Sequence, residues 1–417
     1  MRRRRTLSGT EKKSKLDKLI DPGDGKAVVV AADHGMMLGP IPGAANLEQT
    51  LRRVVEGRPD GILMSPGQAE RLSYFFHGKS SPALLVRGDW TNAFRDRTYT
   101  LPARSTQFCR ITSVKRAVRL GADAMTIYLF VGYQDKEQEE RHLEQARRFS
   151  SECSEWGLPL VIEPVPMGPR VTKTNYHELV KESVALSIQA GADALKVPYT
   201  GDPETFSSVI AAARGIPVLV LGGSKALSDR EPLEAVEEAL SVGASGVVFG
   251  RNVIQSSDPA RFLTLIREVV HGGKTAREAL AKGREGRLFL RTNPSVCTGC
   301  NICLSACAMA RQGNFDITKA RLRVVGTWPG PSAPVVCDQC GECVQVCPTA
   351  ALTMDEKVGG LVYDRDLCTL CDACTTACPH HLLSMDSERV YVCNLCSGWP
   401  ECADWCPTGA IFTEATG

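Results

Sequence analysis

The sequence lacks any run of about 18 apolar residues, the length that a membrane-spanning helix needs, although 43% of its 417 residues are hydrophobic. It also lacks an excess of one charge, since 49 Lys and Arg residues stand against 47 Asp and Glu residues. The net charge of +2 gives no general case for binding nucleic acid or a membrane. The basic residues 1–5 are followed by polar residues, where an export signal has an apolar stretch. We therefore interpret residues 1–19 as a solvated basic tail and expect a cytoplasmic protein.

Cysteine is scarce in the first 296 residues, where only Cys109 and Cys153 occur, and dense in the last 121 residues, which hold 16. We interpret Cys109 and Cys153 as core or surface thiols. The other 16 cysteines form four runs. These runs are Cys297-Cys300-Cys303-Cys307, Cys337-Cys340-Cys343-Cys347, Cys368-Cys371-Cys374-Cys378 and Cys393-Cys396-Cys402-Cys406.

The first three runs keep the spacing C-x2-C-x2-C-x3-C, and the fourth widens only the middle gap. This is the ligand spacing of a [4Fe–4S] cluster, in which three thiolates on one short loop reach three irons. The last cysteine of a partner run holds the fourth iron, so such clusters come in pairs. The pattern therefore predicts four [4Fe–4S] clusters that transfer one electron at a time, and we predict no nucleotide cofactor.

Two other interpretations of the cysteines fit less well. A disulfide scaffold suits a secreted module, but we find no secretory signal and each run is too regular. Zinc ribbons bring their cysteines in pairs with a longer gap, rather than three within seven residues. From residue 290 onward, 8 Lys and Arg residues stand against 13 Asp and Glu residues. We therefore expect this region to present an acidic face to a redox partner protein.

Residues 20–285 alternate short apolar runs with longer stretches of helical character. Near-continuous Val, Ile and Leu is typical of parallel strands that are buried on both faces. The eight runs are residues 27–31, 61–64, 83–86, 124–129, 158–162, 194–197, 217–221 and 246–249. Eight such β/α units predict an α/β fold, a (β/α)8 TIM barrel, with a doubly wound open sheet as the alternative. We expect a ferredoxin-like α+β iron–sulfur domain to follow over residues 286–417.

Chemistry in such a barrel lies at the carboxyl ends of the strands. The candidate residues there are Asp33, His34, Glu163, Lys196 and Tyr199. Lys196 lies within an otherwise apolar strand, where loss of water lowers the pKa of an amine. A neutral amine can attack a carbonyl and form a Schiff base. The alternative is a structural lysine that only pairs with Glu163 or Asp33.

Small residues follow the seventh and eighth strands, the usual place for a phosphate in such barrels. Gly222, Gly223 and Ser224 follow the seventh strand, and Gly250 and Arg251 follow the eighth. Small residues let backbone N–H groups approach an anion, and an arginine adds a charge-assisted contact. The two loops together predict a phosphate-binding site.

Five segments resemble a known family. They are "VVVAADHGMMLGPIPG", "SVKRAVRLGADAMTIYLFVG", "GADALKVPYTGD", "PVLVLGGSK" and "GASGVVFGRNVIQ". Over residues 20–272 the chain resembles the class I aldolases that include archaeal-type fructose-bisphosphate aldolase, 2-amino-3,7-dideoxyheptulosonate synthase and the autoinducer-2 aldolase. The resemblance implies that Lys196 is the Schiff-base lysine, that Asp33 polarises the substrate, and that the two small-residue loops surround a substrate phosphate. It also implies that barrels associate into a homo-oligomer.

One departure from the family concerns acid/base chemistry. The fructose-bisphosphate aldolases of this family carry a segment similar to W-x-Y-P-R-G after the fifth strand, and its Tyr is the acid/base. This chain has Val165 at the position of that Tyr. Glu163 lies two residues earlier, on the same face of an extended strand, and is a candidate replacement. His34 and Tyr199 are further candidates. The departure argues against ordinary fructose-bisphosphate cleavage but leaves Schiff-base carbon–carbon chemistry intact.

Residues 286–417 resemble the four-cluster electron-transfer subunits of molybdenum, tungsten and hydrogenase enzymes. The second and third cysteine runs look like a two-cluster ferredoxin, with 20 residues between Cys347 and Cys368. The resemblance implies that Cys378 completes the cluster of the second run and that Cys347 completes the cluster of the third. It implies the same exchange of Cys307 and Cys406 between the first and fourth runs.

These observations lead to one main hypothesis and two alternatives. The main hypothesis is a carbon–carbon lyase that acts on a small phosphorylated carbonyl compound, fused to a module that passes electrons to or from an oxidoreductase. The first alternative is an electron-transfer subunit whose barrel has lost catalysis. The second is an acyl transferase that depends on coenzyme A.

Overall fold

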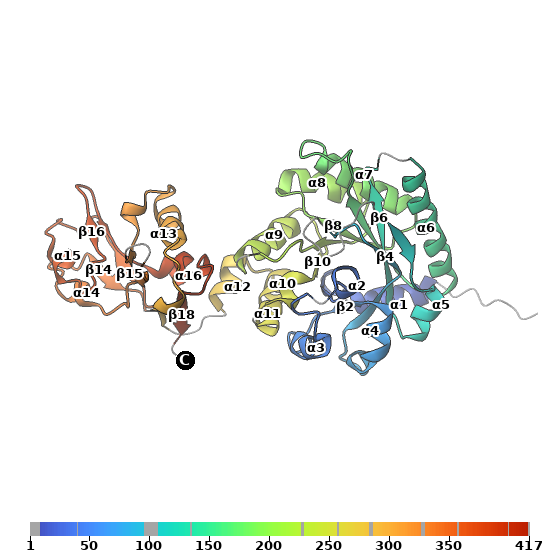
Figure 1. The fold of residues 1–417 in the computed structure, drawn as a ribbon, viewed down its shortest axis with the longest axis horizontal. Helices are drawn as coiled ribbons and strands as arrows, with labels where there is room; N and C mark the ends of the chain where they lie inside the picture. The colour runs from blue at the N-terminus through green and yellow to red at the C-terminus, as the bar shows by residue number, and fades with distance from the viewer. Residues whose placement is uncertain are drawn as a thin grey trace, which may run out of the picture. The chain divides into compact units, whose positions relative to one another are not determined.

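The computed structural model describes residues 9–39, 41–95, 107–133, 136–226, 229–256, 258–282, 287–326, 330–356, 358–398 and 400–415. The chain divides into two compact units, Met1–Ala279 and Leu280–Gly417 (Figure 1). No described helix is both long enough and apolar enough to cross a membrane.

Eight parallel strands of the first unit close into a barrel in the order β1-β10-β9-β8-β7-β6-β3-β2. Their bounds are β1 (Ala27–Ala31), β2 (Gly61–Met64), β3 (Ala83–Arg87), β6 (Ala124–Val131), β7 (Leu160–Pro166), β8 (Ala194–Pro198), β9 (Val218–Leu221) and β10 (Gly246–Phe249). The strands are buried along almost their whole length, because helices cover the outside and side chains fill the inside. The predicted (β/α)8 barrel is confirmed.

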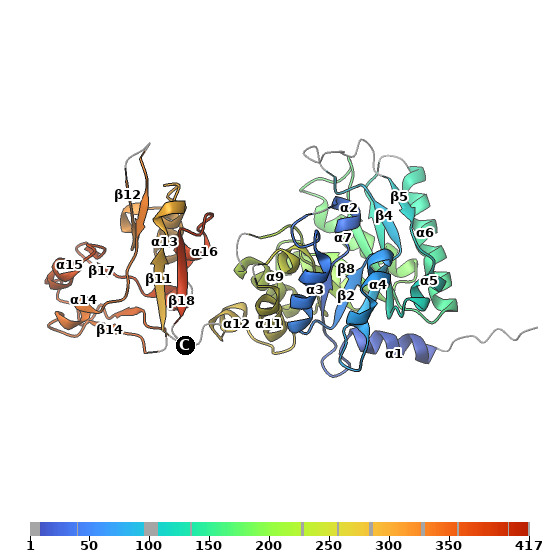
Figure 2. The ribbon, with the colours of Figure 1, turned by 60° about the horizontal axis from the view of Figure 1, so that its bottom comes forward.

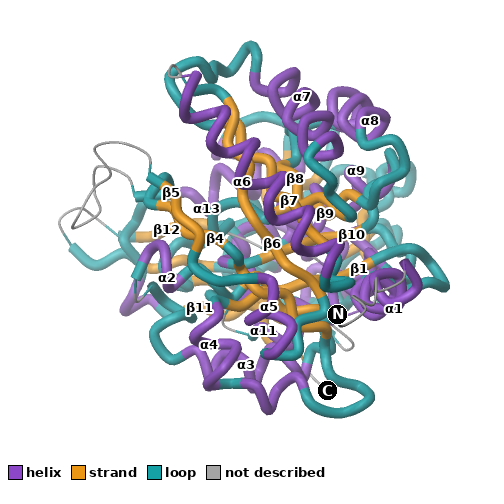
Figure 3. The backbone as a smooth tube through the Cα atoms, turned by 90° about the vertical axis from the view of Figure 1, so that its right-hand side faces the viewer, coloured by secondary structure: helices purple, strands orange, loops and turns teal. Residues whose placement is uncertain are grey.

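Helices lie outside the strands, as Figure 3 shows for the two longest ones beside β6 and β7. The helices of this unit are α1 (Gly9–Leu19), α2 (Gly35–Leu38), α3 (Leu47–Glu56), α4 (Pro66–Arg71), η1 (Ser73–Phe76), α5 (Val114–Arg119), α6 (Lys136–Glu155), α7 (Tyr176–Gln189), α8 (Pro203–Ala212), α9 (Arg230–Ser241), α10 (Arg251–Ile254) and α11 (Pro259–Val270). Local sequence fixes several starts. At α8, for example, Asp202 accepts a hydrogen bond from the Thr205 backbone N–H, and Pro203 occupies the first helical position.

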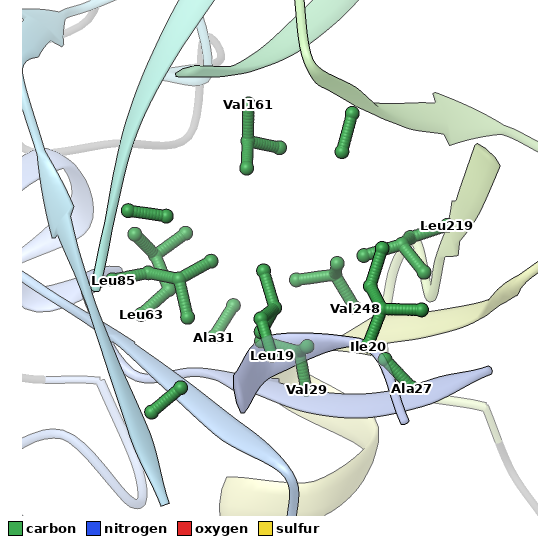
Figure 4. Packing of buried hydrophobic residues seen from close by; sticks show 13 residues of the cluster. Leu19, Ile20, Ala27, Val29, Ala31, Leu63, Leu85, Val161, Leu219 and Val248 are labelled. Carbon is green, nitrogen blue, oxygen red and sulfur yellow. The ribbon is translucent and has the colours of Figure 1, made fainter. Parts of the chain in front are cut away.

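Apolar side chains from most of the strands meet inside the barrel (Figure 4). Ala27 and Val29 of β1 face Val161 of β7 and Val248 of β10 in this cluster. Leu19, at the end of α1, is fully buried against them, and α1 lies beneath the strands in Figure 2. Residues 9–19 are thus a packed helix, not part of a solvated tail, because Leu16 and Leu19 supply an apolar face.

Four strands, β3, β6, β7 and β8, extend further at their carboxyl ends than the apolar runs predicted. Arg87 is the last residue of β3, and Glu163 lies in the middle of β7 rather than after it. A short hairpin follows β3, formed by β4 (Asp89–Thr91) and β5 (Phe108–Arg110). The extension matters because it places charged side chains inside the strands of the barrel.

The second unit consists of short antiparallel strand pairs and short helices. The pairs are β11 (Leu288–Thr292) with β18 (Ile411–Ala415), β12 (Arg323–Val325) with β13 (Ala333–Val335), β14 (Leu352–Met354) with β15 (Leu361–Tyr363), and β16 (Ser384–Met385) with β17 (Val390–Tyr391). The helices are α12 (Ala276–Lys282), which starts in the first unit, η2 (Pro294–Val296), α13 (Ile302–Gln312), η3 (Ile317–Lys319), α14 (Glu342–Gln345), α15 (Ala373–Ala377), η4 (Leu395–Gly398) and α16 (Glu401–Asp404). This is the predicted α+β ferredoxin-like arrangement.

Candidate active site and cluster-binding loops

A buried network of charges lies within the barrel and centres on Arg87, which is fully buried. The Arg87 Nε donates a hydrogen bond to Asp33 Oδ2 at 2.7 Å, and a terminal nitrogen donates to Glu163 Oε2, also at 2.7 Å. The guanidinium also stacks over the Tyr128 ring, 4.0 Å from its centroid. Arg87 therefore holds together the carboxylate of Asp33, which follows β1, and that of Glu163 in β7.

Lys196 joins the same network from β8. Its Nζ lies 2.9 Å from Glu163 Oε1, and the two side chains are only 8% and 6% exposed. Glu163 thus uses one oxygen for Arg87 and the other for Lys196. The network thus sets two basic side chains against two acidic ones, and such pairing is how buried charges are tolerated.

Burial and neighbouring charges set the pKa values of this network. Burial alone would raise the pKa of Asp33, but the positive field of Arg87 and its neighbours outweighs burial and lowers it. Burial raises the pKa of Asp89 to about 7, although Arg87 and a hydrogen bond from the Tyr128 backbone N–H oppose that rise. Burial also raises the pKa of the Tyr128 hydroxyl well above its usual value. Asp33 is therefore ionised at neutral pH, whereas Asp89 is partly protonated.

The remaining acid/base candidates lie in different surroundings. His34 Nδ1 lies 3.8 Å from Asp33 Oδ1, and burial lowers the pKa of the ring, so His34 is neutral at pH 7. Its ring fills the space beside Gly250, where any side chain would collide with it. Tyr199 is not brought into the network, because its hydroxyl donates to Glu238 on α9 at 2.7 Å. Val165 packs in an apolar cluster that includes Tyr128.

The loops after β9 and β10 are tied together by Asn252, which is buried. Its Nδ2 donates to the Gly222 carbonyl at 2.7 Å, and its Oδ1 accepts from the Ala226 backbone N–H at 2.8 Å. Gly223 has a φ of +61° and open space around its α-carbon, so its conformation suits glycine and leaves its surroundings free. The Arg251 Nε is buried without a hydrogen-bond partner among the described residues. An anion between the two loops would supply that partner.

The cysteine loops share an unusual backbone. The residue before the second cysteine of each run has a positive φ: 69° at Gly299, 60° at Gln339, 56° at Leu370 and 53° at Leu395. This conformation is costly for a leucine and marks a functional constraint. Four loops with different sequences therefore adopt the same turn, as loops that bend around the same group would.

Three small pockets in the second unit are each lined by four cysteines, three from one run and the last from another. The groups are Cys337, Cys340, Cys343 and Cys378; Cys347, Cys368, Cys371 and Cys374; and Cys307, Cys393, Cys396 and Cys402. Electrostatic interactions link Cys303 with the other three cysteines that remain, which are Cys297, Cys300 and Cys406. The cysteines thus lie together in the same four groups that an exchange of fourth ligands would require.

The residues present fit cubane clusters. All 18 cysteines are free of disulfide bonds. Across the described ranges, no three Cys, His, Asp or Glu side chains converge closely enough to hold a single metal ion, whereas a cube needs its thiolates spread around it. Cys109 is exposed and Cys153 is buried in the barrel unit. His380 pairs with Asp338 at 3.0 Å.

Three network residues were given no role from the sequence: Arg87 and Asp89, which follow the third predicted strand where chemistry is expected, and Tyr128, which was not singled out. Arg87 directly follows the apolar run of residues 83–86, whereas Lys196 lies inside its run, and the structure extends β3 to include Arg87. Tyr128 gave no signal, since a tyrosine in an apolar strand is ordinary. Only closure of the barrel brings all three together.

Comparison with known proteins follows the division into two units. Residues 27–256 match the DeoC/LacD family aldolase, residues 336–382 match a 4Fe-4S dicluster domain, and residues 294–310 match a 4Fe-4S binding domain. The fold and the matches define a class I aldolase barrel followed by iron–sulfur ferredoxin domains. The chain belongs to the DeoC/LacD aldolase family.

Individual relatives align with the barrel. An uncharacterized aldolase of Saccharolobus solfataricus is 34% identical over 271 residues, which are 64% of this chain and 96% of the relative. The class 1 fructose-bisphosphate aldolase of Thermoproteus tenax is 34% identical over 263 residues, covering 61% and 94% of the two chains. A solved archaeal fructose-1,6-bisphosphate aldolase, whose catalytic Lys is bound to a carbinolamine intermediate, is 30% identical with a TM-score of 0.54. It covers 63% of this chain and 100% of its own.

Proposed function

We propose that the barrel is a Schiff-base carbon–carbon lyase in which Lys196 is the nucleophile. The observation that carries this proposal is the buried contact of 2.9 Å between Lys196 Nζ and Glu163 Oε1. A carboxylate at this distance can take the proton that the ammonium must lose before it attacks a carbonyl. The carbinolamine on the catalytic Lys of a 30%-identical aldolase supports the assignment.

The reaction then follows from the network. Glu163 accepts a proton from Lys196, and the free amine adds to the substrate carbonyl carbon. Loss of the carbonyl oxygen as water leaves an iminium, which withdraws electrons. A base removes the proton of the substrate hydroxyl, the carbon–carbon bond breaks, and its electron pair forms an enamine as an aldehyde leaves. Protonation of the enamine and hydrolysis release the second product and restore Lys196.

Glu163 is the base that we assign to the cleavage step, since Val165 carries no proton. Glu163 is a carboxylate again at this stage, because it gives the proton taken from Lys196 to the carbonyl oxygen that leaves as water when the iminium forms. Asp33, kept ionised by Arg87, binds the guanidinium nitrogen next to the one that binds Glu163, and it polarises the substrate. Arg87 holds both carboxylates and is a positioning residue, because the structure shows it fully buried behind them.

The loops after β9 and β10 bind the substrate phosphate in this proposal. Gly222, Gly223, Ser224 and Gly250 offer backbone groups, and Arg251 offers the unpartnered Nε. Asn252 keeps the two loops at a constant separation. A small phosphorylated carbonyl compound is therefore the substrate class.

The second unit holds four [4Fe–4S] clusters in this proposal, one in each group of four cysteines. The clusters would accept single electrons from a partner oxidoreductase that oxidises the product of the barrel. A retro-aldol reaction releases an aldehyde, and an oxidoreductase that consumes aldehydes would pass its electrons to the clusters. Adding substrate to the protein together with that oxidoreductase should bleach the visible absorbance of the clusters. If no bleaching follows although aldehyde is formed, the coupling is wrong.

Borohydride trapping tests the lyase directly. Anaerobically prepared protein is incubated with borohydride and a panel of phosphorylated ketones and aldehydes, and the adduct is mapped by mass spectrometry. We expect a reduced adduct on Lys196, lost in Lys196→Met but retained in Lys115→Met, a matched exposed lysine on α5. An adduct that persists in Lys196→Met would refute the assignment.

A second candidate function is electron transfer with a catalytically inactive barrel. It is favoured by Val165, which stands at the position where the resemblance to fructose-bisphosphate aldolases implies a tyrosine that acts as acid and base. The trapping experiment separates the two functions, because an inactive barrel forms no adduct with any compound while its clusters remain intact. The paired Lys196 and Glu163 support the lyase over this candidate.

A further inference from the structure

One of the four cysteine groups differs from the others in exposure. Here we name Cys307, Cys393, Cys396 and Cys402 the inner group. None of its four cysteines is exposed, whereas each other group has one exposed member, namely Cys300, Cys340 or Cys371. A cluster in the inner group would therefore be the one best shielded from water.

Two arginines line the pocket of the inner group. They are Arg311 on α13 and Arg321, which is 5% exposed. The Nε of each is buried and has no hydrogen-bond partner within the part of the chain that the structure describes. The Arg321 backbone N–H also donates to Cys307 Sγ at 3.3 Å. Two positive groups and one N–H donor thus approach this pocket, and no acidic side chain is among its described lining residues.

The pockets of the second and third runs have the opposite character. Asp338 and Glu342 line the pocket of Cys337, Cys340, Cys343 and Cys378, together with His380. Asp372 lines the pocket of Cys347, Cys368, Cys371 and Cys374. Neither pocket has an Arg or Lys among its described lining residues. Among these three pockets, only that of the inner group is lined by arginines.

The inner group also has a neighbour on each side. Cys402 interacts electrostatically with Cys303 of the first run. The Cys393 thiol interacts electrostatically with the Cys337 thiol of the second run, and Gln339 Nε2 donates to the Cys393 carbonyl at 3.3 Å. An electron that moves from a cluster bound by the first run to a cluster bound by the second run would therefore pass through the cluster of the inner group.

We propose that Arg311 and Arg321 raise the reduction potential of the cluster in the inner group, so that it holds an electron more strongly than its neighbours do. Reduction adds one negative charge to a cluster that is already anionic, and a nearby guanidinium stabilises that added charge. The effect is large where burial excludes water, since the interaction is then weakly screened. This inference depends on the four-cluster arrangement proposed above.

Redox titration of the full-length protein, followed by electron paramagnetic resonance, tests the proposal. We expect Arg321→Gln to lower the ratio of reduced to oxidised form of one cluster about tenfold at a given potential. This change corresponds to a fall of about 59 mV in the reduction potential of that cluster for one electron. Arg311→Gln should shift the same signal in the same direction, and Arg321→Lys, which keeps the charge, should restore most of the wild-type value. Arg291→Gln is the matched control, because Arg291 pairs with Glu414 on the surface of the same unit and should shift nothing.

Iron analysis of each sample distinguishes the possible failures. If wild-type protein binds less iron than four clusters need, the proposed cluster count is wrong and this inference falls with it. If all variants carry wild-type iron and no signal moves, the count stands and the role of the arginines is refuted. An equal shift in Arg321→Gln and Arg321→Lys would also refute it, because packing rather than charge would then be the cause. If Arg321→Gln loses iron, Arg311→Gln and Arg321→Lys decide the outcome by the same criteria.

Discussion

Replacing Arg87 with methionine should destabilise the barrel by about 3–5 kcal/mol at neutral pH, because Asp33 and Glu163 lose the positive charge that they share. Methionine keeps much of the length of the side chain, so the change removes charge more than volume. For a domain of this size, a loss of this magnitude lowers the melting temperature by roughly 10 °C. The large expected value rests on burial, since Arg87 is fully buried and Asp33 and Glu163 are nearly so.

The loss should depend on pH with a definite sign. The pKa of Asp33 in the folded protein is lowered, so its stabilising contribution is present above its unfolded pKa and is lost as pH falls through the folded pKa. The Arg87→Met variant lacks the charge that lowers this pKa most. The difference in unfolding free energy between the two proteins should therefore be largest near pH 7 and should shrink as the pH falls below about 4.

The assay is urea unfolding of the anaerobic full-length protein, followed by circular dichroism. Arg116→Met is the matched control, because Arg116 pairs with Glu70 while half exposed, and surface pairs contribute about 0–1 kcal/mol. The double variant with Glu163→Gln should lose less stability than the sum of the two single variants, by about 0.5–3 kcal/mol. An Arg87→Met loss no larger than the control, or strict additivity with Glu163→Gln, would refute the idea that this network holds the strands together.

Three further predictions concern the same barrel. Glu163→Gln should lower kcat about 10²–10⁴-fold with the compound that labels Lys196, because the proton acceptor is lost; an unchanged kcat in steady-state assays would exclude this role. Arg251→Ala should raise KM at least about tenfold for a phosphorylated substrate and little for its dephosphorylated analogue, since one charge-assisted contact is lost; equal effects on both compounds would place the phosphate elsewhere. Asp89 keeps its proton to about pH 7 in the folded protein and to about pH 4 when unfolded, so its stabilising contribution falls as pH rises through this window. Asp89→Asn should therefore gain about 2 kcal/mol relative to wild type between pH 5 and 8 in urea titrations, and parallel pH curves would contradict that sign.

Much of the barrel could be predicted because each strand corresponds to a short apolar run that can be recognised without knowledge of distant residues. Runs such as residues 27–31 and 246–249 are short and continuously apolar, and the structure places β1 and β10 on the same residues. Lys196 could be singled out because a charge within such a run is costly unless it has a partner. The cluster-binding loops could also be predicted from the cysteine runs, since cluster ligation requires a constant spacing over a few residues.

What could not be predicted depends on distant residues. Arg87 and Glu163 are 76 positions apart, and only the closed order of the strands brings them within 2.7 Å of each other. Tyr199 was an acid/base candidate because it lies close to Lys196 along the chain. It instead bonds to Glu238, because the neighbouring helix offers a carboxylate at that point. The closeness of two residues along the chain does not determine the direction in which their side chains point.

The sequence by itself determined the periodic features of this protein, namely eight buried strands, four cysteine runs and a lysine inside a strand. These follow from local rules, since burial, turn geometry and ligand spacing each act over a few residues. Only the tertiary structure decided that Arg87 joins Asp33 to Glu163, that α1 closes the base of the barrel, and that the cysteine groups differ in their charged neighbours. These features depend on which distant side chains share a buried space, because the energy of a charge is set by its nearest partners and by the exclusion of water.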